Sequence, residues 1–253
     1  MKIPILSAEN IGKTFHQGGQ ENIILNNLSI KIYSGDFTVI MGSSGAGKST
    51  FLYTLSGMDS VTKGKVYYKG KEMGRLKAKE MARLRAEDFG FVFQQNNLVS
   101  NLSLYENVLV AGFLDVRQKT SEVREHTEHL MKMMHIGEER FRMPAHVSGG
   151  EAQRTAIARA MVGNPEILFA DEPTGALNRK NSEVILDILT ELNEQGQTIL
   201  MVTHDIHAAI RGSRVLYMEN GDVKGEYLFS EMQRQDDKKR EEDLSRWLTQ
   251  MHW

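Results

Sequence analysis

Apolar residues along this chain are concentrated in short runs that have the character of buried strands. The runs cover residues 37–41, 89–93, 167–170 and 198–202, and most are rich in β-branched or aromatic side chains. Helical segments are predicted between them, at residues 49–55, about 103–135, 156–161 and about 180–194. Strands that alternate with helices in this way are typical of an α/β fold.

An antiparallel β region is predicted before the first of these strands. Residues 3–15 and 23–33 alternate imperfectly between apolar and polar positions, and a turn signal at residues 34–36 (Ser-Gly-Asp) follows them. Residues 65–69 have the pattern of another short strand. Near the end of the chain, residues 219–222 (Glu-Asn-Gly-Asp) form a hairpin signal between two final strands.

Two helical patterns are amphipathic. The segment at 103–135 carries one apolar stripe, whose methionines are more typical of core packing than of a ligand site; the stripe is formed by Val123, Leu130, Met131 and Met134. After Ser230 the chain becomes highly charged and then places apolar residues at helical spacing, namely Leu244, Trp247, Leu248 and Met251. This tail predicts a helix that lies on its own domain, and docking to a partner or a membrane surface is the alternative.

Composition and charge limit the classes of function. At 253 residues, 40% hydrophobic and 25% charged, the chain is long enough for one or two compact domains. A net charge of −2 provides no global attraction for nucleic acid, and the lack of cysteine excludes disulfides, thiol catalysis and zinc–thiolate sites. No apolar stretch approaches the roughly 20 residues that span a bilayer, and the first residues do not resemble a signal peptide. Function at a membrane would therefore require another chain.

Positive charge is concentrated locally between residues 69 and 85. Seven basic residues in this run accompany only Glu72 and Glu80. A solvated helix face accounts for such a run, and contact with an anionic lipid surface is the alternative.

The first candidate chemistry lies at residues 42–49, Gly-Ser-Ser-Gly-Ala-Gly-Lys-Ser, between the strand at 37–41 and the helix that follows. This is the pattern G-x-x-x-x-G-K-[ST], in which backbone N–H groups surround a phosphate and a helix N-terminus faces the same charge. Lys48 can reach the β- and γ-phosphates, and the Ser49 hydroxyl can occupy one position on Mg²⁺. A glycine-rich turn with a chance Lys-Ser is the alternative, and it does not account for the flanking strand and helix. We therefore predict a nucleoside triphosphate site.

Polar residues follow two other core strands. Asp171 and Glu172 end the run at 167–170, and His204 follows the run at 198–202. A carboxylate at the end of a buried strand needs a partner, and phosphate-bound Mg²⁺ would suit Asp171, which leaves Glu172 facing the group that attacks the phosphate. A histidine at the carboxyl end of a core strand lies on the ligand-binding edge of an α/β sheet. Alone it would more often be structural, but beside a phosphate loop it is a candidate for catalysis.

Two further features are ambiguous by themselves. Ser148, Gly149 and Gly150 begin a helical segment, as a serine N-cap that leaves N–H groups exposed to an anion, although many helices begin in this way. Phe15 lies close to a predicted turn and is either a core residue or a stacking surface for a nucleotide base.

Together these motifs resemble the ATP-binding subunit of an ABC transporter over residues 1–230. The motifs agree in type, order and spacing; they are the phosphate loop, Gln94, the Ser148–Glu151 signature, Asp171-Glu172, the loop 174–178 and His204. The resemblance implies a P-loop NTPase (RecA-like) core with an antiparallel β subdomain and an inserted α-helical subdomain. It places the core at about residues 1–94 and 162–230, the helical subdomain at about 95–161 and a charged amphipathic tail helix at 231–253.

The resemblance also implies a role for each matching residue. The ATP-binding residues would be Phe15, which stacks on adenine, with Gly42, Ser43, Ser44, Gly45, Ala46, Gly47, Lys48, Ser49 and Thr50. The catalytic residues would be Glu172, which polarises water, His204, which contacts the γ-phosphate, and Gln94, which senses the metal and γ-phosphate. Mg²⁺ would be bound near Ser49, Gln94 and Asp171. In a head-to-tail homodimer, the ATP of one subunit would contact the signature of the other, Ser148, Gly149, Gly150 and Glu151.

Three residues depart from the family pattern. Asn178 replaces the usual Asp of the loop after the Asp-Glu strand (the D-loop), which loses a charge and puts coupling across the dimer or the rate of hydrolysis in question. Glu151 replaces Gln in the signature, and Phe15 replaces Tyr, and both changes are mild. Hydrolysis is still expected because Lys48, Glu172 and His204 are present.

Residues 90–95 and 170–177 resemble the branch that contains bacterial macrolide exporters, lipoprotein-release ATPases and bacitracin- or lantibiotic-resistance transporters. This implies a separate transmembrane permease, a location on the cytoplasmic side of the cell membrane, and no nucleic-acid partner. We favour export of, or resistance to, a peptide antibiotic. The alternative is a regulatory ATPase that drives a membrane protein controlling a sensor histidine kinase or a cell-wall hydrolase without transport. A DNA-repair or chromosome ATPase is disfavoured, because Lys48 and Ser148 are only 100 residues apart and no cysteine could form a zinc segment.

Overall fold

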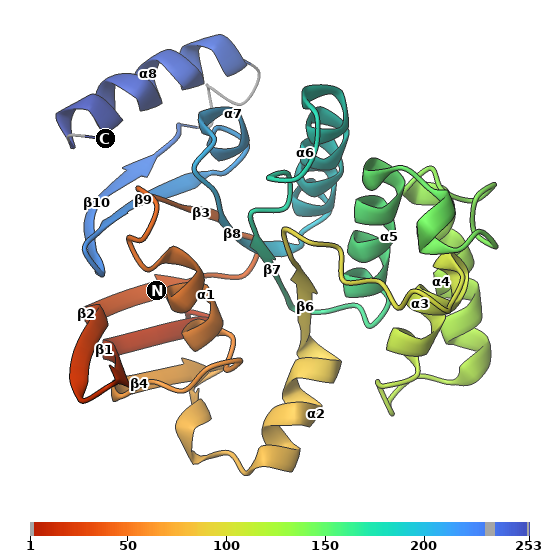
Figure 1. The fold of residues 1–253 in the computed structure, drawn as a ribbon, viewed down its shortest axis with the longest axis horizontal. Helices are drawn as coiled ribbons and strands as arrows, with labels where there is room; N and C mark the ends of the chain where they lie inside the picture. Colours follow the sequence, from red (N-terminus) through yellow and green to blue (C-terminus); the bar gives the residue numbers. More distant parts are fainter. Residues whose placement is uncertain (1–2, 231–235, 252) are drawn as a thin grey trace. The chain divides into compact units, whose positions relative to one another are not determined.

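A computed structural model describes residues 3–230, 236–251 and 253 of the chain (Figure 1). Residues 231–235 and 252 of the predicted tail therefore lie outside the described residues. The chain divides into two compact parts. The first part consists of the residues up to Lys77 and those from Thr198 onward, and the second part consists of Ala78–Gln197. Each part is described by itself.

The first part contains the predicted antiparallel sheet. Its strands follow the order β2-β1-β4-β5, with bounds β1 (Leu6–Gln17), β2 (Gln20–Ile32), β4 (Lys63–Tyr68) and β5 (Lys71–Glu72). The pairing of β1 with β2 shifts register between Ala8 and Thr14, and Asn10 and Asn27 have φ values of 50° and 56°. Such irregularities interrupt the alternation of side chains, which explains the imperfect pattern of this region. The strand predictions at 3–15, 23–33 and 65–69 are confirmed.

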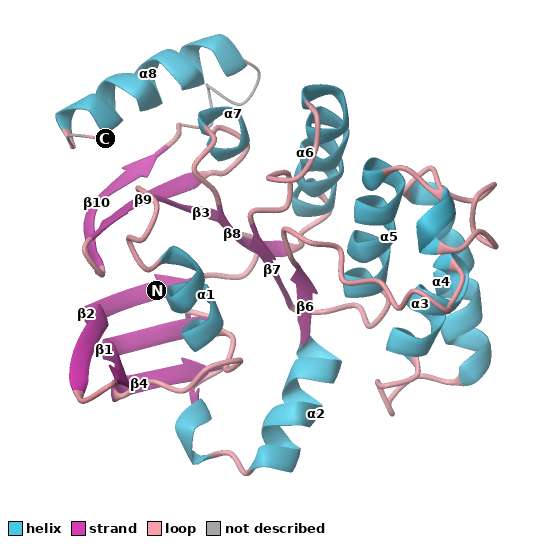
Figure 2. Cartoon of the chain, in the orientation of Figure 1, coloured by secondary structure: helices cyan, strands magenta, loops and turns pink. Residues whose placement is uncertain are grey.

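The first part also contains the phosphate-loop strand, drawn in magenta with its neighbours in Figure 2. Strand order is β10-β9-β3-β8, with bounds β3 (Phe37–Met41), β8 (Thr198–Val202), β9 (Arg214–Glu219) and β10 (Asp222–Leu228). Every residue of β3 and β8 is buried, and β3 runs parallel to both β8 and β9. The short helices that follow β3 and β8 are α1 (Lys48–Leu55) and α7 (Ile206–Ala209). Asn220 and Gly221 both have positive φ, as the predicted two-residue hairpin requires.

The described tail forms helix α8 (Asp237–Gln250), which packs on the first part. Leu244 and Leu248 are fully buried. The Arg240 guanidinium lies 4.0 Å from the Phe229 ring centroid and donates a hydrogen bond to the Gly212 carbonyl. Trp247 contacts Tyr227 of β10, with ring centroids 5.5 Å apart.

The second part has one parallel strand pair and most of the helices. The strands are β6 (Phe89–Val92) and β7 (Ile167–Asp171), and the helices are α2 (Ala78–Asp88), α3 (Leu104–Gly112), α4 (Thr120–Met133), α5 (Gly149–Met161) and α6 (Arg179–Glu194). Val123, Leu130, Met131 and Met134 are buried, so the prediction that this stripe packs in the core is confirmed.

The stretch predicted to be helical at about 103–135 forms two helices, α3 and α4, which are separated by residues 113–119. The buried Asp115 carboxylate accepts hydrogen bonds from the backbone and guanidinium of Arg117, which stabilises a turn after α3. At the end of α3, a Cβ on Gly112 would lie 2.5 Å from a Val123 methyl carbon, so glycine permits α3 and α4 to approach closely. The chain reverses here because the two apolar faces pack on each other.

The basic run also differs from a single helix face. Lys71 lies in β5, Arg75 ends a single turn of 3₁₀ helix (η1, Met73–Arg75), and Lys79, Arg83 and Arg85 lie on α2. No residue of α2 is buried, which agrees with a solvated surface. Within the described residues, no helix has the length and apolar character needed to cross a bilayer.

Candidate functional site

The phosphate loop adopts a backbone that only glycine permits at two positions. Gly42 and Gly47 have φ values of 156° and 94°. A Cβ on Gly42 would lie 2.1 Å from the Met218 carbonyl oxygen, and one on Gly47 would lie 2.9 Å from the Ile24 carbonyl oxygen. Gly42 and Gly47 therefore allow the loop to turn, and they also allow backbone from other segments to pack closely behind it.

Helix α1 begins directly after this loop. Gly47 is its N-cap and has no side chain that could accept a hydrogen bond from the N–H groups of the first turn. Lys48 is 9% exposed, and its ammonium donates to the carbonyls of Gly42 at 2.8 Å and Ser43 at 2.9 Å. The ammonium therefore lies across the loop.

The β9–β10 hairpin supports the loop from behind. The Gly221 N–H donates to the Ala46 carbonyl at 3.1 Å, and the Gly221 carbonyl accepts from the Asn26 N–H at 2.9 Å. Sequence reasoning identified this hairpin only as a connection between strands. Its contact with the loop has no local sequence signal, because the partners come from distant segments.

His204 lies at the same sheet edge as the phosphate loop. Strands β3 and β8 are parallel, with Ile40 opposite Val202, and the Thr203 N–H donates to the Ile40 carbonyl at 3.1 Å. His204 is exposed, and the next residue, Asp205, caps α7 by accepting from the His207 N–H at 2.9 Å. The predicted position at the carboxyl end of a core strand is confirmed.

Phe15 lies on the surface of β1 with 44% of its area exposed, so the alternative that it is a core residue is wrong. The Lys13 ammonium lies 4.8 Å from the ring centroid. Lys13 is itself buried and pairs with the Asp59 carboxylate at 2.6 Å. A cation next to an exposed ring is compatible with stacking of a base on the ring's accessible surface.

In the second part, Gln94 and the Asp171-Glu172 pair follow adjacent parallel strands. Val92 lies opposite Ala170, and Asp171 is 7% exposed. Glu172 has a φ of 48°, an uncommon conformation for a residue with a side chain. A Cβ on Gly175 would lie 2.9 Å from the Gln94 amide nitrogen, so the Gln94 side chain lies against the turn that follows Glu172.

The signature caps helix α5 as predicted. The Ser148 hydroxyl accepts from the Glu151 N–H at 3.3 Å, and the Ser148 N–H donates to the Glu151 carboxylate at 2.6 Å. Hydrogen bonding of the Glu151 carboxylate to the Ser148 side chain, and to the Ser148 backbone N–H, lowers the pKa of Glu151. Glutamate thus completes a capping box, a role that glutamine also performs, and the S-x-x-E spacing is the sequence signal for it.

Asn178, the departure in the D-loop, is the N-cap of α6. Its side-chain oxygen accepts from the Asn181 N–H at 3.0 Å, a contact that aspartate would also make. A Cβ on Gly150 would lie 2.7 Å from the Asn181 side-chain oxygen, so the second signature glycine permits close packing of α6 on α5.

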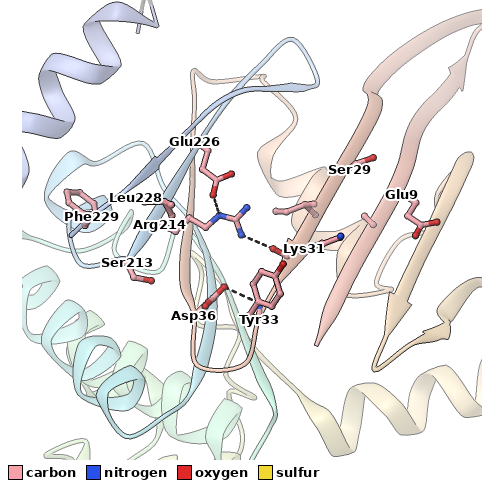
Figure 3. Close-up of a pocket in the computed structure, with 12 residues that line it drawn as sticks. Glu9, Ser29, Lys31, Tyr33, Asp36, Ser213, Arg214, Glu226, Leu228 and Phe229 are labelled. Carbon is pink, nitrogen blue, oxygen red and sulfur yellow. Dashed lines mark hydrogen bonds and ion pairs between the residues drawn. The ribbon is translucent and has the colours of Figure 1, made fainter. Parts of the chain in front are cut away.

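Of two hollows in the structure, one is lined by predicted site residues and the other is not. A pocket of about 400 Å³ in the second part is lined by Gln94 to Leu98, Gly149, Gln153, Ala176 and Leu177. A larger groove of about 890 Å³ in the first part, shown in Figure 3, contains none of the predicted site residues. At its centre, Arg214 pairs with Glu226 at 2.8 Å and donates to the Lys31 carbonyl at 2.7 Å. The smaller hollow contains two of the predicted site residues, Gln94 and Gly149. Among the described residues, no group of three or more His, Cys, Asp or Glu side chains could hold a metal.

Residues 25–175 match the family described as ABC transporter. The chain belongs to this family. It is an ATP-binding subunit and an ABC-type ATPase, as predicted. Its fold is the predicted α/β fold of the ABC ATPases.

Individual relatives agree with this assignment. The ABC transporter chain is 43% identical over 222 residues to the lipoprotein-releasing system ATP-binding protein LolD of Aquifex aeolicus, covering 88% of this chain and 97% of LolD. It is 33% identical over 223 residues to the macrolide export ATP-binding/permease protein MacB of Pasteurella multocida, covering 88% of this chain and 34% of MacB. A solved dimer of the ATP-binding cassette MJ0796, in a post-hydrolysis state bound to ADP and Pi, matches with a TM-score of 0.83 at 37% identity, covering 89% of this chain and 99% of that one. The predicted resemblance to the lipoprotein-release and macrolide-export branch is confirmed.

Proposed function

We propose that this chain is the motor subunit of a membrane transporter, in which ATP binding and hydrolysis drive a separate permease. Two observations support this proposal most directly. Asp171 and Glu172 lie at the end of a strand whose neighbour leads to Gln94. The phosphate loop and His204 follow adjacent parallel strands and lie at the same edge of their sheet.

ATP would be bound mainly by the first part. Phe15 would stack on adenine, and residues 42–50 would surround the phosphates with backbone N–H groups, the N-terminus of α1 and the Lys48 ammonium. The position of Lys48 across the loop supports this role, because its donors already lie beside the loop carbonyls.

Mg²⁺ fits the oxygen donors that the chain provides. These are the Ser49 hydroxyl, the Gln94 amide oxygen and the Asp171 carboxylate, which are oxygen ligands of the kind that Mg²⁺ prefers. A small protein donor set is typical of Mg²⁺ that remains bound to substrate phosphates and water. The ion would neutralise charge on the phosphates.

Hydrolysis would depend on Glu172 and His204. The Glu172 carboxylate would accept a hydrogen bond from the attacking water and orient it, and His204 would contact the γ-phosphate where charge develops. The strained backbone of Glu172 supports a functional role, since such conformations are concentrated at active sites.

The signature would complete the site across a homodimer. Ser148 and Gly149 are exposed on the second part, and the dimeric state of the matched MJ0796 structure supports this arrangement. ATP would favour the closed dimer because it contacts both subunits, and hydrolysis would remove those contacts.

The permease would locate this subunit on the cytoplasmic side of the membrane. Exposed large apolar residues of the second part are candidates for its contact surface; they are Val99, Val110, Phe113, Leu114, Val116, Phe141 and Met143. Relatives named for lipoprotein release and macrolide export support an amphipathic or lipid-linked substrate, and within that class we propose a peptide antibiotic.

Replacement of Glu172 tests the proposed chemistry. Glu172→Gln keeps the size of the side chain but removes its charge, so steady-state ATP hydrolysis should fall by about 10²-fold or more, and an ATP-bound dimer should accumulate on size exclusion. Glu194→Gln, an exposed change at the end of α6, should leave both properties unchanged, and Lys48→Ala should prevent ATP-dependent dimerisation. Hydrolysis at the parental rate by Glu172→Gln would remove Glu172 from the proposed role.

A further inference from the structure

The signature helix α5 carries a buried amide that none of the predicted roles uses. Gln153, on the turn after the Ser148 cap, is 2% exposed. Its amide nitrogen donates to the Phe93 carbonyl at 2.9 Å and to the Pro173 carbonyl at 2.9 Å. An amide group has two N–H donors, and both are used.

The two accepting carbonyls adjoin the proposed catalytic residues. Phe93 directly precedes Gln94, and Pro173 directly follows Glu172. One side chain therefore joins the backbone beside the metal-sensing glutamine to the backbone beside the proposed catalytic glutamate.

A second residue of α5 stabilises the far end of the same loop. The Arg159 guanidinium donates to the carbonyls of Asn96 and Asn97, each at 2.7 Å. Burial of Arg159 lowers its pKa. Helix α5 thus binds the Gln94 loop at both ends, and through Gln153 it also binds the Glu172 turn.

Loss of the Gln153 donors would affect geometry more than ATP binding. The Phe93 and Pro173 carbonyls would lose a buried partner, and the Glu172 backbone, at a φ of 48°, depends on its surroundings to remain in that conformation. The Phe15 ring and the phosphate loop, which we propose to bind most of the nucleotide, lie in the other part of the chain.

We propose that Gln153 is a positioning residue for hydrolysis, which sets the Gln94 loop and the Glu172 turn relative to each other and joins both to the signature helix. The inference rests on the proposed function, because it requires Gln94 to act at Mg²⁺ and Glu172 at water.

The test compares two buried substitutions on α5. Gln153→Met has a similar length but no donors, and it should lower kcat for ATP hydrolysis by about 10-fold to 100-fold, because small displacements of catalytic groups have effects of this size. The KM for ATP should remain within about twofold, and the Mg²⁺ concentration for half-maximal activity should rise, because Gln94 is displaced. Thr155→Val is the matched control: Thr155 is fully buried and donates only within α5, to the Glu151 carbonyl at 2.8 Å, so its kcat and Mg²⁺ dependence should remain parental.

The outcomes separate this inference from the proposed function. If Gln153→Met has the parental kcat and Mg²⁺ dependence while Glu172→Gln is inactive, the positioning role is wrong and the proposed function stands. If Glu172→Gln remains active, the proposed function fails, and the inference fails with it. If Gln153→Met does not fold, Gln153→Asn replaces it, since its side chain is one methylene shorter and its amide can no longer reach both carbonyls. Parental values of kcat and Mg²⁺ dependence for Gln153→Asn would overturn the proposal, and a lower kcat with a raised Mg²⁺ requirement would support it.

Discussion

Among single residues, two glycines with positive φ have different surroundings: Gly35 lies before the phosphate-loop strand, and Gly42 lies in the loop itself. Gly35 and Gly42 both have positive φ, at 80° and 156°, but a Cβ on Gly35 would meet nothing within 4 Å. On Gly42 it would overlap the Met218 carbonyl oxygen. Alanine substitutions at the two positions therefore separate the energetic cost of a positive φ from the cost of overlap with a backbone atom.

We expect Gly35→Ala to lower the free energy of unfolding by about 1 kcal/mol, the cost of a positive φ for alanine. Gly42→Ala should cost more than about 3 kcal/mol, because a backbone oxygen must also move. Chemical denaturation of both variants measures the difference. Equal losses would show that the Met218 carbonyl shifts freely and that the close approach is unimportant.

The side-chain contacts of Asn178 and Glu151 show what their departures from the family pattern change in the local structure. Asn178 caps α6 through a side-chain oxygen that aspartate also has, and Glu151 completes a capping box that glutamine can also form. Both substitutions therefore preserve the local structure and change the charge, which is lost at Asn178 and gained at Glu151.

Among the elements, helix α8 packs on the chain with a small number of side chains. Leu244 and Leu248 are fully buried, and Arg240 is 6% exposed. On the same helix Arg246 is exposed and forms only a local ion pair with Asp243 at 3.2 Å. The contribution of packing can therefore be measured against a surface residue of the same helix.

We expect Leu244→Ala to lower the free energy of unfolding by about 2–5 kcal/mol, the range for a buried leucine that leaves a cavity. Arg246→Ala should change it by less than about 0.5–1 kcal/mol, because exposed ion pairs contribute little. Urea denaturation of the full chain provides both values. If the two variants unfold alike, α8 does not pack as described and is available for another partner.

At the scale of the whole molecule, the proposed function requires a transmembrane permease. The LolD relative is named as the ATP-binding protein of a releasing system. The subunit should therefore be recovered with a second polypeptide.

Purification of the chain from native membranes in mild detergent, followed by mass spectrometry, should identify a co-purifying protein with several spanning segments. The segment count and the presence of a large extracytoplasmic region would distinguish the macrolide, lipoprotein and peptide-resistance types. Recovery of a sensor histidine kinase without such a permease would contradict the transport proposal and favour the regulatory one.

The sequence by itself determined the strands, most helices and the identity of the candidate residues. These features depend on neighbours within a few positions: an apolar β-branched run forms a buried strand, and Asn220-Gly221 permits a tight hairpin. The phosphate loop and the Ser148 cap are also local patterns, in which spacing alone places the donors.

The tertiary structure alone decided how the segments support one another. Gln153 contacts carbonyls 60 and 20 residues away, Gly221 supports a loop formed by Ala46 and its neighbours, and the helical stretch at 103–135 divides where Gly112 permits two helices to pack. No local pattern encodes such partners, because a buried amide or glycine looks the same in sequence whatever it contacts. Their identity depends on which distant backbone groups the folded chain brings within hydrogen-bonding distance.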